Sequence, residues 1–150
     1  MKKLTATLGL AFLVIMAMGR GVAAEEVVGV VKTLKGMAAI ERNDKSVPAK
    51  IGDKLFEKDV IVTGKISSLG AILRDDSLIS IGSNTRLAIS RYIFKPADRN
   101  VSSVFKINKG TMTYLSGLIA KMDGKAVRVE TPTASCGIRG THLAVKVEDD

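Results

Sequence analysis

Hydrophobic and polar residues alternate one by one over several short stretches of the chain. Val127 and Val129 alternate with polar neighbours, and the same period of two recurs in residues 86–90 and 142–147. A period of two places successive side chains on opposite faces of a strand. Each stretch therefore predicts a strand with one buried face and one exposed face.

Turn-forming residues separate these stretches at short intervals. Glycine tolerates a positive φ, and asparagine and aspartate bond to nearby backbone amides. The expected turns are Lys35-Gly36, Asn43-Asp44, Gly52-Asp53, Asp75-Asp76, Gly82-Ser83-Asn84, Asn108-Lys109-Gly110 and Asp123-Gly124. Many short strands with regular turns predict an all-β fold: a compact sandwich or roll, or a solenoid-like stack of short strands.

Two segments are less regular. Residues 111–122 permit either a helix or a strand: apolar residues have a helical spacing, but threonines, a glycine and neighbouring strand patterns favour a strand. The helical stripe would contain Met112, Leu115, Ile119 and Met122. We predict mostly strand here, and a polar loop between the two halves of the domain at residues 96–100.

The N-terminal residues have the pattern of a secretory signal. Lys2 and Lys3 precede an uncharged apolar run at residues 8–18, and residues 22–24 are small. The run is shorter than the roughly 20 residues that span a bilayer. We expect a signal-peptide helix in residues 1–24, cleavage after Ala24, and one exported domain in residues 25–150 without a stable membrane span. The alternative is an uncleaved N-terminal anchor.

Charge gives little support to nucleic-acid binding. The formal net charge of +8 falls to +5 when Lys2, Lys3 and Arg20 leave with the signal peptide. The remaining basic residues are scattered among acids, and aromatic residues make up 4% of the chain. Nucleic-acid binders usually carry a basic stripe, often with stacking aromatics.

The single cysteine and single histidine both lie in residues 126–147. Cys136 has two interpretations in an oxidising compartment: a reactive thiol or intermolecular disulfide, or a small buried apolar side chain, which we favour. His142 has no Cys, His or acidic partner at ligand spacing, and alternation places it with Lys146 on a polar face. We expect no metal site and no cofactor.

Arg139 is the strongest candidate for binding in this segment. Lying between Gly137 and Gly140, and followed by Thr141, it has the setting to present a guanidinium and nearby amides to a carboxylate or phosphate. The alternative, which we favour, is a structural arginine paired with an acid such as Glu130. A nucleotide loop is excluded because a strand pattern follows the glycines.

No catalytic constellation is evident. A serine nucleophile needs a histidine base, and sequence proximity to serines is all that His142 offers. Asp75 and Asp76 are adjacent carboxylates, but neighbouring strand residues point to opposite faces, and a turn explains the pair better. We predict that the protein is not an enzyme.

Ordered motifs over most of residues 28–141 resemble one family. They lie at residues 28–31, 34–38, 51–55, 59–64 (Asp-Val-Ile-Val-Thr-Gly), 71–77, 81–87, 109–121 and 130–141, the last reading Glu-Thr-Pro-Thr-Ala followed by Gly-Ile-Arg-Gly-Thr. Their order resembles the FecR domain, the extracytoplasmic module of FecR-type regulators of iron–siderophore signalling and of other bacterial envelope proteins.

The resemblance implies an extracytoplasmic module without an assigned catalytic residue. In the regulators, a cytoplasmic anti-sigma portion and a membrane helix precede the domain, whereas here the expected signal peptide does. We expect a periplasmic or secreted protein that binds an envelope or inner-membrane protein in sensing or signal relay, by strand addition at a sheet edge.

Other possibilities remain open at this stage. The alternative function is a structural or glycan-associated module, with peptidoglycan as a partner, while iron binding by the domain itself has little support. Family members commonly continue with another strand pair, so the end at residues 148–150 is expected to be either a short natural version or a truncation.

Overall fold

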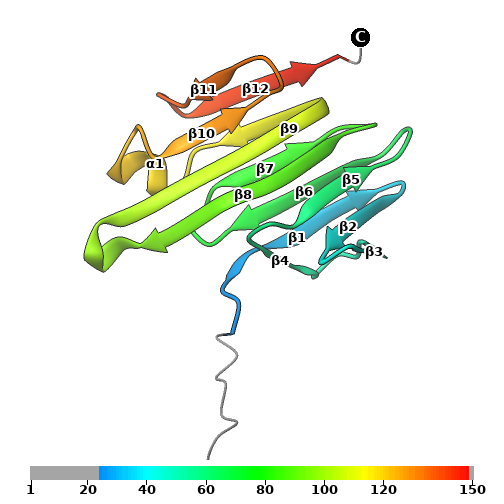
Figure 1. Ribbon diagram of the computed structural model, residues 1–150, viewed down its shortest axis with the longest axis horizontal. Helices are drawn as coiled ribbons and strands as arrows, with labels where there is room; N and C mark the ends of the chain where they lie inside the picture. Colours follow the sequence, from blue (N-terminus) through cyan, green and yellow to red (C-terminus); the bar gives the residue numbers. More distant parts are fainter. Residues whose placement is uncertain (1–23, 149–150) are drawn as a thin grey trace, which may run out of the picture.

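The computed structural model describes residues 24–148, which form a 12-stranded sheet. The predicted signal peptide lies outside the described residues, apart from Ala24. Figure 1 shows the strands as one broad curled sheet, with β1–β4 at one edge and β10–β12 at the other. The prediction of an all-β fold is confirmed.

Most of the strands are short, and β1, β8 and β9 are the longest. They are β1 (Val27–Lys35), β2 (Ala38–Arg42), β3 (Lys45–Pro48), β4 (Lys54–Phe56), β5 (Val60–Thr63), β6 (Ser68–Leu73), β7 (Leu78–Ile81), β8 (Arg86–Lys95), β9 (Asn100–Leu115), β10 (Val127–Glu130), β11 (Ser135–Gly137) and β12 (His142–Val147). A 3-10 turn, η1 (Pro96–Asp98), joins β8 to β9, and a short helix, α1 (Leu118–Met122), follows β9.

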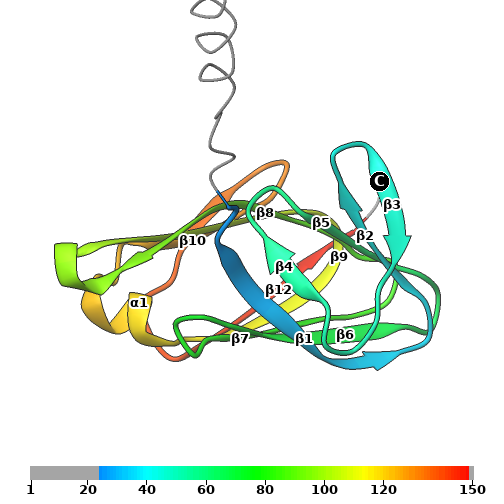
Figure 2. The same ribbon diagram turned by 90° about the horizontal axis from the view of Figure 1, so that it is seen from below.

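The sheet folds over into two layers (Figure 2). The first layer contains β3, β2, β5, β8, the first half of β9, β10 and β11. The second contains β4, β1, β6, β7, the second half of β9 and β12. All these pairings are antiparallel except that of β10 with β9. This is the sandwich or roll of the prediction rather than a solenoid.

β9 passes from one layer to the other at Gly110. The backbone there has φ +96°, a region that favours glycine, and Thr85 occupies the space that a Cβ would need. The turn predicted at residues 108–110 is therefore wrong. The glycine bends a strand that continues, instead of ending it.

One apolar core fills the space between the layers. Its members come from the strands at both edges of the sheet as well as from the centre. The fully buried side chains include Val31, Leu55, Ile61, Leu87, Ile89, Phe105, Ile107, Tyr114, Val127 and Val129. These include the inward-facing residues that alternation predicts at 87, 89, 127 and 129.

At one end of the molecule, three connections cross between the layers: β1–β2, β5–β6 and β7–β8. Backbone and serine groups bind them together. The Met37 amide donates to Ser67 Oγ at 2.9 Å, and the Ser67 amide donates to Ser83 Oγ at 3.0 Å. The Gly64 amide donates to the Met37 carbonyl at 2.9 Å. We call these loops, together with the Gly110 bend, the crossover end.

The ambiguous segment at residues 111–122 divides into two elements. β9 runs to Leu115, as predicted, but Leu118–Met122 is helical, so the prediction of strand is wrong there. The Leu118 amide donates to the Asp75 carbonyl at 2.7 Å, and the Ile119 amide donates to Asp75 Oδ2 at 3.2 Å. The polar loop predicted at residues 96–100 is the exposed turn between the adjacent strands β8 and β9, except that Asn100 is already the first residue of β9.

Candidate functional site

The C-terminal crossover, residues 124–147, brings most of the candidate residues to one edge of the molecule (Figure 1). β10 lies parallel to β9, and the alternation of its residues is as predicted: Val127 and Val129 are buried and Arg128 is exposed. β11 pairs with β10 and is the outermost strand of the first layer within residues 24–148.

The prediction that Cys136 is buried is wrong. Cys136 is a free, exposed thiol in β11. β11 has three residues, and among residues 24–148 it pairs with β10 alone, so no further strand covers it. The apolar residue that this segment buries is Ile138, which is 3% exposed.

The favoured interpretation of Arg139, a structural pair with Glu130, is also wrong. The cation near Glu130 is Arg128, at 4.0 Å, and within residues 24–148 Arg139 has no ion pair. The exposed Arg139 lines a groove of about 380 Å³ with Lys125, Arg128 and Gly137. Gly124 and Ser135 complete the lining of this basic groove.

Gly140 and Thr141 have a different place from Arg139 and Gly137. Ser116 Oγ donates to the Gly140 carbonyl at 2.6 Å, and the Ser116 amide donates to the Thr141 carbonyl at 2.9 Å. Gly140 has φ +131°, which suits glycine. These two residues therefore fix the start of β12 against the end of β9 and do not line the groove.

β12 presents a polar face and a backbone edge. His142, Ala144 and Lys146 are exposed, as alternation predicts, whereas Leu143, Val145 and Val147 pack partly against the core. In an antiparallel ladder, hydrogen-bonded pairs alternate. The Ser116–Thr141 bond sets the phase, so the amides at 143, 145 and 147 face β9 and those at 142, 144 and 146 face away from it.

No described strand lies beyond that edge. Among residues 24–148, β12 pairs with β9 alone. Its outward amides and carbonyls are the groups that an added strand would engage.

Asp75 is the centre of a buried polar cluster, not half of a carboxylate pair. Tyr92 Oη donates to Asp75 Oδ1 at 3.0 Å, and Ser77 Oγ donates to the same oxygen at 2.6 Å. Asp75 is fully buried in the β6–β7 turn, whereas Asp76 is exposed at φ +63°. The predicted turn is confirmed, and the carboxylates do not act together.

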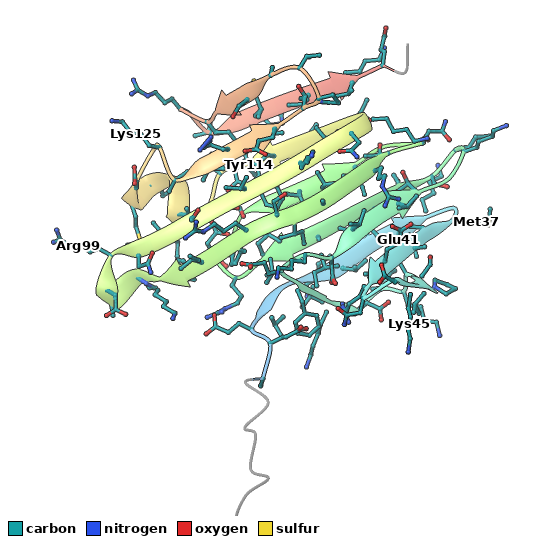
Figure 3. All side chains as sticks on the ribbon, viewed as in Figure 1. Met37, Glu41, Lys45, Arg99, Tyr114 and Lys125 are labelled. Carbon is teal, nitrogen blue, oxygen red and sulfur yellow. The ribbon has the colours of Figure 1, made fainter. Side chains whose placement is uncertain are left out.

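Burial also perturbs two phenols beside this cluster. It raises the pKa of Tyr92, with a further contribution from Asp75, and raises the pKa of Tyr114 to about 12. Tyr114 Oη is buried without a hydrogen-bond partner among the described residues. Tyr114 lies on β9 between β7 and β12 (Figure 3). Asp75 and Tyr114 are fully buried and belong to the core, whereas Tyr92 also lines a pocket with Glu57 and Lys58.

Asp59 is a second buried carboxylate, and the sequence did not predict its pairing with an arginine. Arg42 binds Asp59 through two hydrogen bonds of 2.6 Å and lies 4.4 Å above the Phe56 ring. The Phe56 amide donates to Asp59 Oδ2 at 2.8 Å. Asp59 is the first residue of the motif at residues 59–64, which was the available signal. Its role is to hold β2 and β4 together.

Metal and membrane features are few in the described part of the chain. Residues 24–148 contain no group of three His, Cys, Asp or Glu side chains placed to hold a metal ion. In the same range, no helix has the length and apolar character needed to cross a membrane.

Comparison with protein families identifies the class. A model of the family described as FecR protein matches residues 59–150, which is more than half of the chain, and the chain therefore belongs to the FecR family. This family is regulatory rather than enzymatic, and its domain is extracytoplasmic. No curated protein and no solved structure gives a significant match.

The match begins at Asp59, just before β5. β1–β4 precede it, yet they complete both layers of the same sheet. The resemblance of residues 28–55 to the family stays a prediction.

Proposed function

We propose that the protein is a non-enzymatic component of the bacterial cell envelope that binds a protein partner in sensing or signal relay. Membership of the FecR family supports this role. In this proposal, residues 25–150 are exported as one domain after cleavage behind Ala24. The partner is an envelope or inner-membrane protein.

The edge of β12 that no strand within residues 24–148 covers is the observation that carries the proposal. Six consecutive residues form this edge strand, with outward-facing backbone groups at 142, 144 and 146. A partner strand paired there would extend the second layer by main-chain hydrogen bonds. The half-buried Leu143, Val145 and Val147 would give side-chain contacts on the core side of the new strand.

A proline substitution tests this mode of binding. Ala144→Pro removes an amide that faces away from β9, so the native ladder keeps its bonds while the added strand loses a donor. We expect capture of a specific membrane protein from envelope extract by the parent chain and its loss with Ala144→Pro. Ala144→Thr keeps the amide and is the matched control.

Two results would contradict the proposal. One is capture of the same protein by Ala144→Pro as well as by the parent. The other is co-sedimentation with peptidoglycan in the absence of any protein partner, which would favour the second candidate function. Thermal unfolding of each variant confirms that the fold is retained.

The second candidate is a structural or glycan-associated module. The basic groove favours it, since Lys125, Arg128 and Arg139 surround one concave surface, and peptidoglycan carries carboxylates that guanidinium groups bind well. In this case Arg139→Ala weakens sedimentation with purified peptidoglycan, whereas Lys45→Ala, a change at the exposed start of β3 on the opposite edge of the sheet, does not.

A further inference from the structure

The exposed large apolar side chains of residues 24–148 fall into three groups. Ile72, Leu78 and Leu115 form a row on the outer face of the second layer, and Leu118 and Met122 belong to α1. The others lie between β1 and β6. Met37 and Ile66, at 77% and 85% exposed, are the two most exposed of all. They occupy the β1–β2 and β5–β6 loops of the crossover end.

These two side chains lie on adjacent loops that are firmly held. The Met37 amide donates to Ser67 Oγ, and the Met37 carbonyl accepts from Gly64. Ser67 itself is 4% exposed, so its hydroxyl is an internal tie. We call Met37 and Ile66 the apolar tip. Figure 3 shows Met37 at the end of the molecule opposite Arg99.

Ile66 has an unusual backbone conformation for its residue type. Its φ is +49°, a left-handed value that is an outlier for a β-branched residue. Asparagine or glycine would occupy this position with less strain. An isoleucine here costs backbone energy and gains no burial within the described residues, which suggests that its side chain serves an external contact.

Among the described residues, the charged side chains of the crossover segments have one sign. The crossover segments 35–37, 64–67, 82–85 and 108–111 contain Lys35, Lys65 and Lys109 and no acidic residue. On neighbouring strands, Glu41 and Glu148 are ion-paired with Arg86 and Lys146. The tip is therefore apolar at its centre and cationic at its margin.

An apolar groove adjoins the tip. It has a volume of about 550 Å³ and runs from Met37 along β2, β3 and β5, where Ala39, Pro48, Ala49 and Val62 are among the lining residues. The apolar surface thus continues from the loops onto the outer face of the first layer.

We propose that the crossover end docks on an anionic phospholipid surface, with Met37 and Ile66 inserted among the acyl chains and Lys35 and Lys65 at the head groups. Shallow insertion of apolar side chains, supported by basic residues, is how peripheral proteins hold a membrane interface. A stable protein interface buries about 800 Å² and about 20–30 residues on each partner, whereas the apolar tip consists of two side chains. Strand addition at β12 is a separate contact.

Vesicle sedimentation tests the proposal. The protein is purified as its host processes it, and every variant has the same N-terminus, so any contribution of the N-terminal residues cancels. We expect binding to phosphatidylglycerol–phosphatidylethanolamine vesicles and much weaker binding to phosphatidylcholine vesicles. Lys35→Ser and Lys65→Ser should each lower the affinity about fivefold at low salt.

The decisive variant is Met37→Ser/Ile66→Asn. It should lower vesicle affinity at least about tenfold, because two apolar side chains no longer enter the bilayer. Asparagine accepts the left-handed backbone at the second position, so thermal stability stays the same or rises, and loss of binding is not loss of folding. Ile72→Thr also replaces an exposed apolar side chain with a polar one, but on the outer face of the second layer. It should leave vesicle binding unchanged.

Several outcomes would overturn the proposal. These are no binding of the parent to anionic vesicles, equal binding by the double variant, or an equal loss with Ile72→Thr. Loss of protein capture by the tip variants, without vesicle binding by the parent, would assign the tip to a protein partner instead. Ala144→Pro keeps vesicle binding, so failure here is distinguishable from failure of the proposed function.

Discussion

At the scale of single residues, the two buried tyrosines differ in what their hydroxyls do. Tyr92 Oη both donates to Asp75 Oδ1 and accepts from the Asp75 amide, each at 3.0 Å. Tyr114 Oη has no partner within residues 24–148. A buried polar group without a hydrogen-bond partner destabilises the folded state. Removing a buried polar group that has a partner is also costly, because the partner is left unpaired.

Phenylalanine substitutions should therefore give opposite results. Tyr92→Phe leaves the Asp75 amide without this acceptor and removes one of the donors to Asp75 Oδ1, and it should lower the free energy of unfolding by about 1–3 kcal/mol. Tyr114→Phe should leave it unchanged or raise it by up to about 1 kcal/mol. Urea unfolding measures both, and a larger loss for Tyr114→Phe would show that its hydroxyl is bonded in solution.

The same tyrosines predict loss of stability at alkaline pH. Both folded pKa values are raised above the ordinary value of 10, so the unfolded chain ionises first and binds fewer protons. Their contribution is complete below about pH 10 and is lost as pH rises further, at up to about 1.4 kcal/mol per pH unit for each tyrosine.

Urea unfolding between about pH 9.5 and 11.5 measures this slope. Tyr114→Phe removes one titrating group and leaves the lysines unchanged. Between the unfolded and the folded pKa of Tyr114, the free energy of unfolding should therefore fall less steeply with pH in the variant than in the parent. An identical slope in parent and variant would contradict the assignment.

At the scale of elements, β9 is the member that joins the two layers. It pairs with β8 and β10 before Gly110 and with β7 and β12 after it. Thr85 lies against this bend: its hydroxyl accepts from the Thr111 amide at 3.0 Å. The crossing of β9 therefore depends on one glycine and one threonine.

Two glycine-to-alanine changes separate structural from permissive positions. Gly110→Ala introduces a Cβ against Thr85 at a left-handed φ and should lower the free energy of unfolding by about 2 kcal/mol or more. Gly137→Ala has open space in an extended strand and should change it by less than about 0.5 kcal/mol. Thermal unfolding of both variants gives the comparison, and equal effects would contradict this account of the bend.

At the scale of the whole molecule, local pattern predicts strands but not their neighbours. Alternation identifies the buried faces of β10 and β12 correctly. It gives no sign that β9 continues through Gly110, because Asn-Lys-Gly has the composition of a turn. Helix α1 depends on Asp75, which is 44 residues before Ile119 in sequence, and residues 111–122 contain no trace of that contact.

The candidate site was predicted in part for the same reason. Arg139 and Gly137 were singled out from the segment that contains them, and both line the basic groove. Lys125 and Arg128 join them because β10 lies between β9 and β11, an arrangement set by the sheet. Cys136 was misplaced because its exposure follows from the outer position of β11, which composition does not reveal.

Amide hydrogen exchange of β12 tests the central claim most directly. In the free protein, the amides of His142, Ala144 and Lys146 should exchange fast, and those of Leu143, Val145 and Val147 slowly. With the captured membrane protein bound, we predict that the first set becomes protected while the second set changes little. Fast exchange at 142, 144 and 146 in the complex would contradict strand addition at this edge.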